Sequence, residues 1–150
     1  MGSGRAGGWD CRSAHPVYIG NPRPSRVAST RAVLREIETL TGLRFPVTTN
    51  RAAAHVTMDW RTPPAEAGHA AGAALTTYGS GGHVHRATVW IEPQPVHEHE
   101  IVRALRHDLA HVVGLDHVED LRSVMGPAWW FVEGYSAADR EALRSWGCMP

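Results

Sequence analysis

The stretch "RHDLAHVVGLDHVEDLRSVMGP", Arg106 to Pro127, decides how this chain is interpreted. His107 and His111 lie four residues apart, in a segment whose apolar residues recur with helical spacing. Side chains four apart on a helix lie one turn above the other on one face, so two imidazoles there can bind one metal ion. Gly114 can take the conformation that ends a helix, which lets the chain turn and return His117 as a third ligand.

A site of three histidines leaves the fourth tetrahedral position to water, which is the arrangement of catalytic zinc sites. Structural zinc sites are usually closed by a fourth protein ligand, and neither of the two cysteines, Cys11 and Cys148, lies near this stretch. We therefore predict one catalytic Zn²⁺ bound by His107, His111 and His117.

Apolar periodicity and turn residues predict the elements around this stretch. Strands are expected at 15–22, 43–49, 54–60, 73–79 and 85–93, and helices at 25–42 and 98–113. Pro46 places the second strand at an edge or a bulge, and Gly42 ends the first helix. The apolar stripes of the two helices comprise Val27, Val33, Leu34, Ile37 and Leu40, then Ile101, Val102, Leu105, Leu109, Val112 and Val113. This order of elements predicts an α/β fold with a mixed, mostly parallel sheet.

The stretch resembles the signature of the metzincin zinc endopeptidases, H-E-x-x-H-x-x-G-x-x-H, in the form found in the matrixin-like bacterial group. The matching residues are His107, His111, Gly114, His117, Asp120 and the methionine of the Met-turn, Met125. The chain departs from the signature at Asp108, where the family has Glu. With less specific motifs, the resemblance covers Trp9 to Gly147.

The resemblance implies a metzincin-like zincin fold of α/β (α+β) class, with a twisted mixed sheet and two long helices in an upper subdomain. A small lower subdomain would hold the Met-turn and a C-terminal helix at about 137–146. We expect a flexible leader at 1–8 and one catalytic domain at 9–150, divided into 9–117 and 118–150. Met125 would form a base under the zinc site without binding the metal.

The implied activity is that of a zinc endopeptidase, with Asp108 as the general base in place of Glu. Aspartate has the same functional group but is one methylene shorter, so its oxygen falls about 1–1.5 Å short, and a misplacement of that size can cost ~100-fold in rate. We expect an enzyme of reduced or altered activity. The alternative is a zinc-binding domain that binds peptides without cleaving them.

The family also implies where a peptide substrate would bind. An extended substrate would pair with an edge strand, here expected at 73–79 through Ala74, Leu75 and Thr76. The segment after the Met-turn would form an apolar pocket wall, with Pro127, Trp129, Trp130 and Phe131. The alternative for these aromatic residues is that they cover the core of the lower subdomain.

Seven histidines lie outside the signature. His69, His83 and His85 are faintly similar to a structural zinc loop of vertebrate matrixins, but the aspartates of that loop are missing, so we assign no second zinc. His97 and His99 are expected on the solvated first turn of the second helix, and His15 and His55 at strand ends. Asp116 is expected at the surface or behind a ligand, and the sequence gives no support for calcium.

Composition limits the partners. Fifteen basic residues, all Arg, balance fifteen acidic ones, which argues against nucleic acid or an anionic membrane. No apolar run reaches the ~18 residues that span a bilayer, and the glycine-rich start does not read as a signal peptide. We expect a monomer that acts on peptides or proteins.

Cys11 and Cys148 are either two structural thiols or one bridge between the ends of the chain. A bridge would indicate an oxidising compartment. Because a matrixin-like fold could bring the two ends together, we predict the disulfide and a secreted or extracytoplasmic location.

Overall fold

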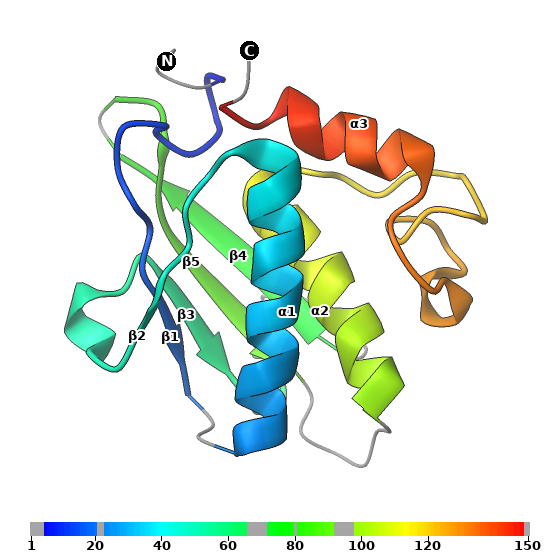
Figure 1. The fold of residues 1–150 in the computed structure, drawn as a ribbon, viewed down its shortest axis with the longest axis horizontal. Helices are drawn as coiled ribbons and strands as arrows, with labels where there is room; N and C mark the ends of the chain where they lie inside the picture. Colours follow the sequence, from blue (N-terminus) through cyan, green and yellow to red (C-terminus); the bar gives the residue numbers. More distant parts are fainter. Residues whose placement is uncertain (1–4, 21–22, 66–71, 80, 92–97, 149–150) are drawn as a thin grey trace.

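The computed structural model describes residues 5–20, 23–65, 72–79, 81–91 and 98–148 (Figure 1). Its sheet has five strands in the order β2-β1-β3-β5-β4. The strands are β1 (Val17–Ile19), β2 (Val47–Thr48), β3 (Val56–Asp59), β4 (Gly72–Tyr78) and β5 (Val84–Ile91). All neighbours are parallel except β4, which runs antiparallel to β5 at the edge of the sheet. The predicted mixed, mostly parallel sheet is confirmed.

Two long helices lie side by side on one face of the sheet, and a third lies apart, near the chain ends (Figure 1). They are α1 (Pro24–Thr41), α2 (Glu98–Val113) and α3 (Ala137–Ser145). The 3₁₀ turn η1 (Arg51–Ala53) lies between β2 and β3, and η3 (Trp129–Phe131) lies between α2 and α3. The α/β fold class is therefore confirmed, including the C-terminal helix.

The first helix begins and ends as its residues dictate. Pro24 stands in the first turn, where its missing N–H is not needed, and Gly42 ends the helix at φ 74° with its N–H bonded to the carbonyl of Glu38. The predicted stripe is correct except at Val27, which is only half-buried. Arg26 is buried in its place, with its guanidinium 4.7 Å from the ring centroid of Trp60, because the aromatic face and the long aliphatic stem let this cation leave water.

The strand predicted at 43–49 is much shorter than expected. Only Val47 and Thr48 pair with β1, and β2 lies at the sheet edge, as Pro46 predicted. Proline has no N–H to donate to a ladder, although the Pro46 carbonyl still accepts the N–H of Val17 at 2.8 Å. Leu43 and Phe45 before it are buried in the core instead of forming a strand.

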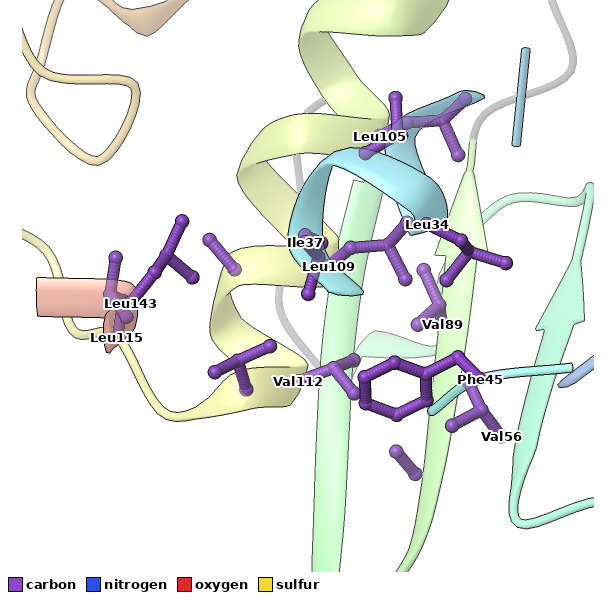
Figure 2. Packing of buried hydrophobic residues seen from close by; sticks show 14 of the residues in the cluster. Leu34, Ile37, Phe45, Val56, Val89, Leu105, Leu109, Val112, Leu115 and Leu143 are labelled. Carbon is purple, nitrogen blue, oxygen red and sulfur yellow. The ribbon is translucent and has the colours of Figure 1, made fainter. Parts of the chain in front are cut away.

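The core lies between the two long helices and the sheet (Figure 2). Leu34 and Ile37 of α1 and Leu105 and Leu109 of α2 face Val89 of the sheet within one cluster. The stripe of α2 is buried as predicted, apart from the half-buried Val102, and Ala104 and Ala110 are buried as well. Leu115 and Leu143 extend the cluster toward α3 (Figure 2). This packing fixes α2, the helix that carries His107 and His111, two of the three predicted ligands.

A disulfide joins the N-terminal segment to the segment after α3. Cys11 and Cys148 form a disulfide across a sequence separation of 137 residues, which confirms the predicted bridge. The C-terminal tail also bonds to the end of α1, where the Cys148 N–H donates to the carbonyl of Thr41. Among the described helices, none is both long and apolar enough to cross a bilayer.

Candidate metal centre

The three predicted histidines come together at the end of α2. His107 and His111 project from successive turns of the helix, and after Gly114, at φ 141°, the chain returns His117 to the same point. The Nε2 atom of His111 lies 3.3 Å from that of His107 and 3.1 Å from that of His117. Within the part of the chain that the structure describes, this is the one group of three side chains able to hold a metal ion.

Backbone carbonyls set the tautomer of the two helical histidines. Nδ1 of His107 donates to the carbonyl of Val124 at 2.7 Å, and Nδ1 of His111 donates to the carbonyl of Leu115 at 2.7 Å. A carbonyl can only accept, so Nδ1 carries the proton and Nε2 carries a lone pair. The Nε2 atoms of His107 and His111 therefore present two lone pairs to each other, an arrangement that a cation between them would stabilise.

The distances from Nε2 of His111 to the other two nitrogens fit a tetrahedral metal. Metal–nitrogen bonds of about 2.0–2.1 Å place the nitrogens of two tetrahedral ligands about 3.3–3.4 Å apart. The observed 3.3 and 3.1 Å agree with that requirement. Burial also lowers the pKa of His107 to about 4 and lowers that of His111, which keeps both imidazoles in the neutral form that binds metals.

Asp108 follows His107 on α2 and is only 2% exposed. Burial raises the pKa of its carboxyl group to about 8, and none of the ion pairs seen among the described residues involves it. Without a nearby cation the group is therefore largely a neutral acid at pH 7. A divalent cation held by the adjacent histidines would lower this pKa again by stabilising the charged form.

A tight turn under the histidines contains Met125, which is 1% exposed. The carbonyl of Met125 accepts the N–H of Val118, which ties the turn to the residue after His117. At the next position a Cβ on Gly126 would lie 1.8 Å from the carbonyl oxygen of Asp120, so only glycine fits there. The turn thus contains a buried methionine followed by a position that only glycine can occupy.

The N-terminus of α3 holds this turn in place. Asp139 forms a capping box with Ser136, and its buried carboxylate also accepts the N–H of Val124 at 3.0 Å and the hydroxyl of Ser123. The Val124 peptide is therefore fixed on both sides, because its N–H bonds to Asp139 and its carbonyl to His107.

Two stacked aromatic rings form one side of the site. The ring of Trp129 lies 4.5 Å from that of His107 at an interplanar angle of 23°, and Trp130 stacks on Trp129 at 4.2 Å. Arg103 of α2 donates to the Trp130 carbonyl at 2.8 Å, which holds this segment against the helix. Phe131 is 82% exposed and so covers no core.

The other residues predicted for substrate binding are exposed or half-buried. Pro127 is exposed, directly after the turn, and Leu75 of the edge strand β4 is 51% exposed. Ala74 and Thr76 are half-buried on the same strand. Since β4 pairs with β5 on one side alone among the described strands, its other backbone edge is open to an added strand.

None of the other histidines that the structure describes joins the site. His15 and His55 lie just before β1 and β3, as expected, and their Nδ1 atoms are 3.0 Å apart. His83 bonds to the carbonyl of Gly8, whereas His85 and His99 are exposed. His69 and His97 lie outside the described residues, and Asp116 is exposed at the surface.

Sequence reasoning missed the groups that orient the ligands. The Val124 and Leu115 carbonyls leave no signal, because every residue has one. Asp139 could have been found in part, since "SAAD" has the spacing of a capping box before a helix. The contact of Asp139 with the methionine turn joins residues distant in the sequence, so no local pattern predicts it.

Neither protein-family profiles nor curated protein sequences match the chain. The fold is similar to that in the crystal structure of myroilysin, with a TM-score of 0.64 at 10% sequence identity, over 92% of this chain and 84% of that one. At this identity the likeness concerns the fold.

Proposed function

We propose that this chain is a zinc-dependent endopeptidase, in which His107, His111 and His117 bind the metal. The observation that carries the proposal is the convergence of the three histidines, with Nε2 of His111 at tetrahedral spacing from Nε2 of His107 and of His117. In His107 and His111 a carbonyl bonded to Nδ1 leaves the lone pair on Nε2. The match to the metzincin signature and the fold shared with the metzincin myroilysin support it.

The donor set favours zinc at a catalytic site. Three neutral imidazoles form the first coordination shell, and no fourth protein ligand gathers with them among the described residues, which leaves a position for water. Bound zinc would lower the pKa of that water and polarise the scissile carbonyl.

Asp108 is the proposed proton carrier. Its carboxylate would accept a proton from the attacking water and deliver it to the leaving amine. The short side chain places this group about 1–1.5 Å farther away than glutamate would, so we propose a turnover reduced by up to ~100-fold. A second water between the carboxylate and the attacking water would relay the proton.

The substrate class we propose is an extended peptide. Its backbone would pair with the open edge of β4 at Ala74, Leu75 and Thr76. An apolar side chain of the substrate would lie against Trp129 and Trp130, beside Pro127. This class of substrate requires no nucleic acid, membrane or second copy of the chain.

The second candidate is a zinc-binding domain that holds peptides without cleaving them. The observation that favours it is the same substitution, because Asp108 is both shorter than glutamate and deeply buried. The two candidates share the metal and the peptide-binding residues and differ only in catalysis.

Metal content and cleavage test the proposal together. Elemental analysis of protein supplied with zinc should give one zinc per chain, lost in His107→Ala and His111→Ala and greatly weakened in His117→Ala. A quenched-fluorescence peptide library should be cleaved, and a chelator should stop the cleavage. Absence of bound zinc would refute the metal centre. If zinc is bound but no peptide is cleaved, the peptide-binding candidate remains.

A further inference from the structure

Each cysteine of the disulfide lies two residues beyond a tryptophan, in "WDC" and in "WGC". Both tryptophans contact the C-terminal end of α2. The indole N–H of Trp9, which is fully buried, donates to the Val112 carbonyl at 2.9 Å. The indole of Trp146 lies so close to Gly114 that a Cβ there would come within 2.6 Å of the ring. The disulfide therefore links the two segments that enclose the last turn of α2.

That turn positions two of the three candidate metal ligands. The N–H groups of Gly114 and Leu115 both bond to the carbonyl of Ala110, which shapes the end of the helix. The Leu115 carbonyl then accepts Nδ1 of His111, and two residues later the chain supplies His117. A displacement of this turn would therefore move the Leu115 carbonyl, which orients His111, and would also shift the backbone that carries His117.

The disulfide joins a fixed segment to a tail. The N-terminal segment is held on the sheet, where the Val84 N–H donates to the Gly8 carbonyl. Trp146 lies beyond the end of α3 and is covered by the N-terminal segment, with the Arg5 guanidinium 3.9 Å from its ring centroid and Gly8 packed against it. The bond through Cys148 thus keeps Trp146 pressed between that segment and Gly114.

We propose that the Cys11–Cys148 disulfide controls the affinity of the metal centre through these two tryptophans. When the bond is formed, the indoles hold the turn at Val112 to Leu115 in the geometry that binds the metal. Reduction by a dithiol transfers two electrons and two protons, giving two thiols and oxidising the dithiol to its own disulfide. The tail is then held by the hydrogen bond from the Cys148 N–H to the Thr41 carbonyl without the covalent link, so Trp146 can move away from Gly114 and the metal is bound more weakly.

The inference rests on the proposed function only in requiring that the histidines bind zinc. Groups that orient a metal ligand from behind typically change metal affinity by 10–100-fold when they are lost. Since disulfides form in oxidising compartments, the chain would acquire full zinc affinity only there, and a chain with free thiols would be a weak peptidase.

Zinc competition against a chromophoric chelator tests the inference. The full chain with its disulfide is compared with Cys11→Ser/Cys148→Ser, which contains no thiol to bind zinc, at a temperature where circular dichroism shows both folded. We expect zinc affinity about 10-fold or more weaker in the double variant. Equal affinities would overturn the inference alone, whereas no zinc binding in either protein would overturn the metal centre and the inference with it.

A second set of variants keeps the disulfide and separates positioning from general destabilisation. Trp146→Leu should weaken zinc binding by about 10-fold, and Trp146→Phe should restore most of it, because a ring again covers Gly114. Trp60→Leu is the matched control, since it removes an indole elsewhere and should leave zinc affinity unchanged. In a Trp146→Leu background the cysteine replacements should add little. A full additional loss there would mean that the bond does not act through Trp146.

Discussion

The candidate site holds its residues in two different ways. His107 and His111 each have a backbone carbonyl behind the ring, which fixes the orientation of the ligand atom. Asp108 is positioned by burial, which is also the cause of its raised pKa. Ligand geometry is therefore fixed by hydrogen bonds, whereas the reach of the carboxylate depends on the length of the side chain.

Asp108 variants test that dependence. Asp108→Asn should keep zinc but lower kcat by at least ~100-fold, because an amide cannot accept the proton. Asp108→Glu should keep zinc and raise kcat by ~10-fold, because the longer side chain reaches the attacking water. Peptide cleavage and zinc content are measured on the same samples. Wild-type turnover in Asp108→Asn would exclude Asp108 as the proton carrier.

At the residue scale, the sequence predicts what depends on local spacing. His107, His111 and Gly114 follow from the helical repeat and from the conformational freedom of glycine. The partners of the histidine rings could not be predicted, because a carbonyl has no residue type and its direction depends on how the methionine turn packs.

Among the elements, α3 matters to the site through its first turn. Asp139 caps the helix and binds the methionine turn with the same carboxylate. Ser136 takes part only in the cap. Substitutions at Ser136 and Asp139 therefore distinguish two contributions to stability. One is the cap of the helix, and the other is the bond to the turn that supports His107.

Replacing Asp139 should be more costly than replacing Ser136. Ser136→Ala removes a cap and should lower the free energy of unfolding by about 1 kcal/mol. Asp139→Ala also leaves the buried N–H of Val124 without its partner and should lower it by about 2–4 kcal/mol. Urea denaturation measures both values. Equal losses would show that the bond between Asp139 and the turn contributes nothing.

The elements themselves were predictable where one periodicity dominated. The stripe of α2 and the stop at Gly42 follow from the sequence, and so does the edge position of β2. The length of β2 could not be predicted from the sequence. Leu43 and Phe45 have residue types that suit a strand, but they pack in the core and do not pair with a neighbouring strand. The burial of Arg26 depends on Trp60, a residue distant in sequence, and no local pattern indicates it.

At the scale of the whole molecule, His15 is a buried histidine outside the metal centre that contributes to the pH dependence of stability. His15 is 3% exposed and lies between His55 and the carbonyl of Asp10, with Arg44 also near. Burial, the largest cause, lowers its pKa below the usual value despite the favourable bond to Asp10. In the unfolded chain the imidazole of His15 is therefore protonated near pH 6.5, whereas in the native chain it is protonated only at a lower pH.

The sign of the effect follows from that difference. Stability from His15 is fully present above about pH 6.5 and is lost as the pH falls through the lowered pKa, at up to about 1.4 kcal/mol per pH unit. Urea denaturation at pH 7.5 and 5.5, with a chelator present, should show a smaller pH dependence for His15→Gln than for the wild type. Replacing the exposed His85 with Gln is the control. An unchanged pH dependence in His15→Gln would refute the assignment.

The disulfide between Cys11 and Cys148 also determines how cleavage of the backbone would be detected. Nearly the whole chain lies between Cys11 and Cys148, so covalently the molecule is a closed ring with two short ends. A single cut of the backbone anywhere between them releases no fragment, because the disulfide still joins the two pieces. Electrophoresis without reductant would then show one band of unchanged mass, and the cut would appear only after the bridge is reduced.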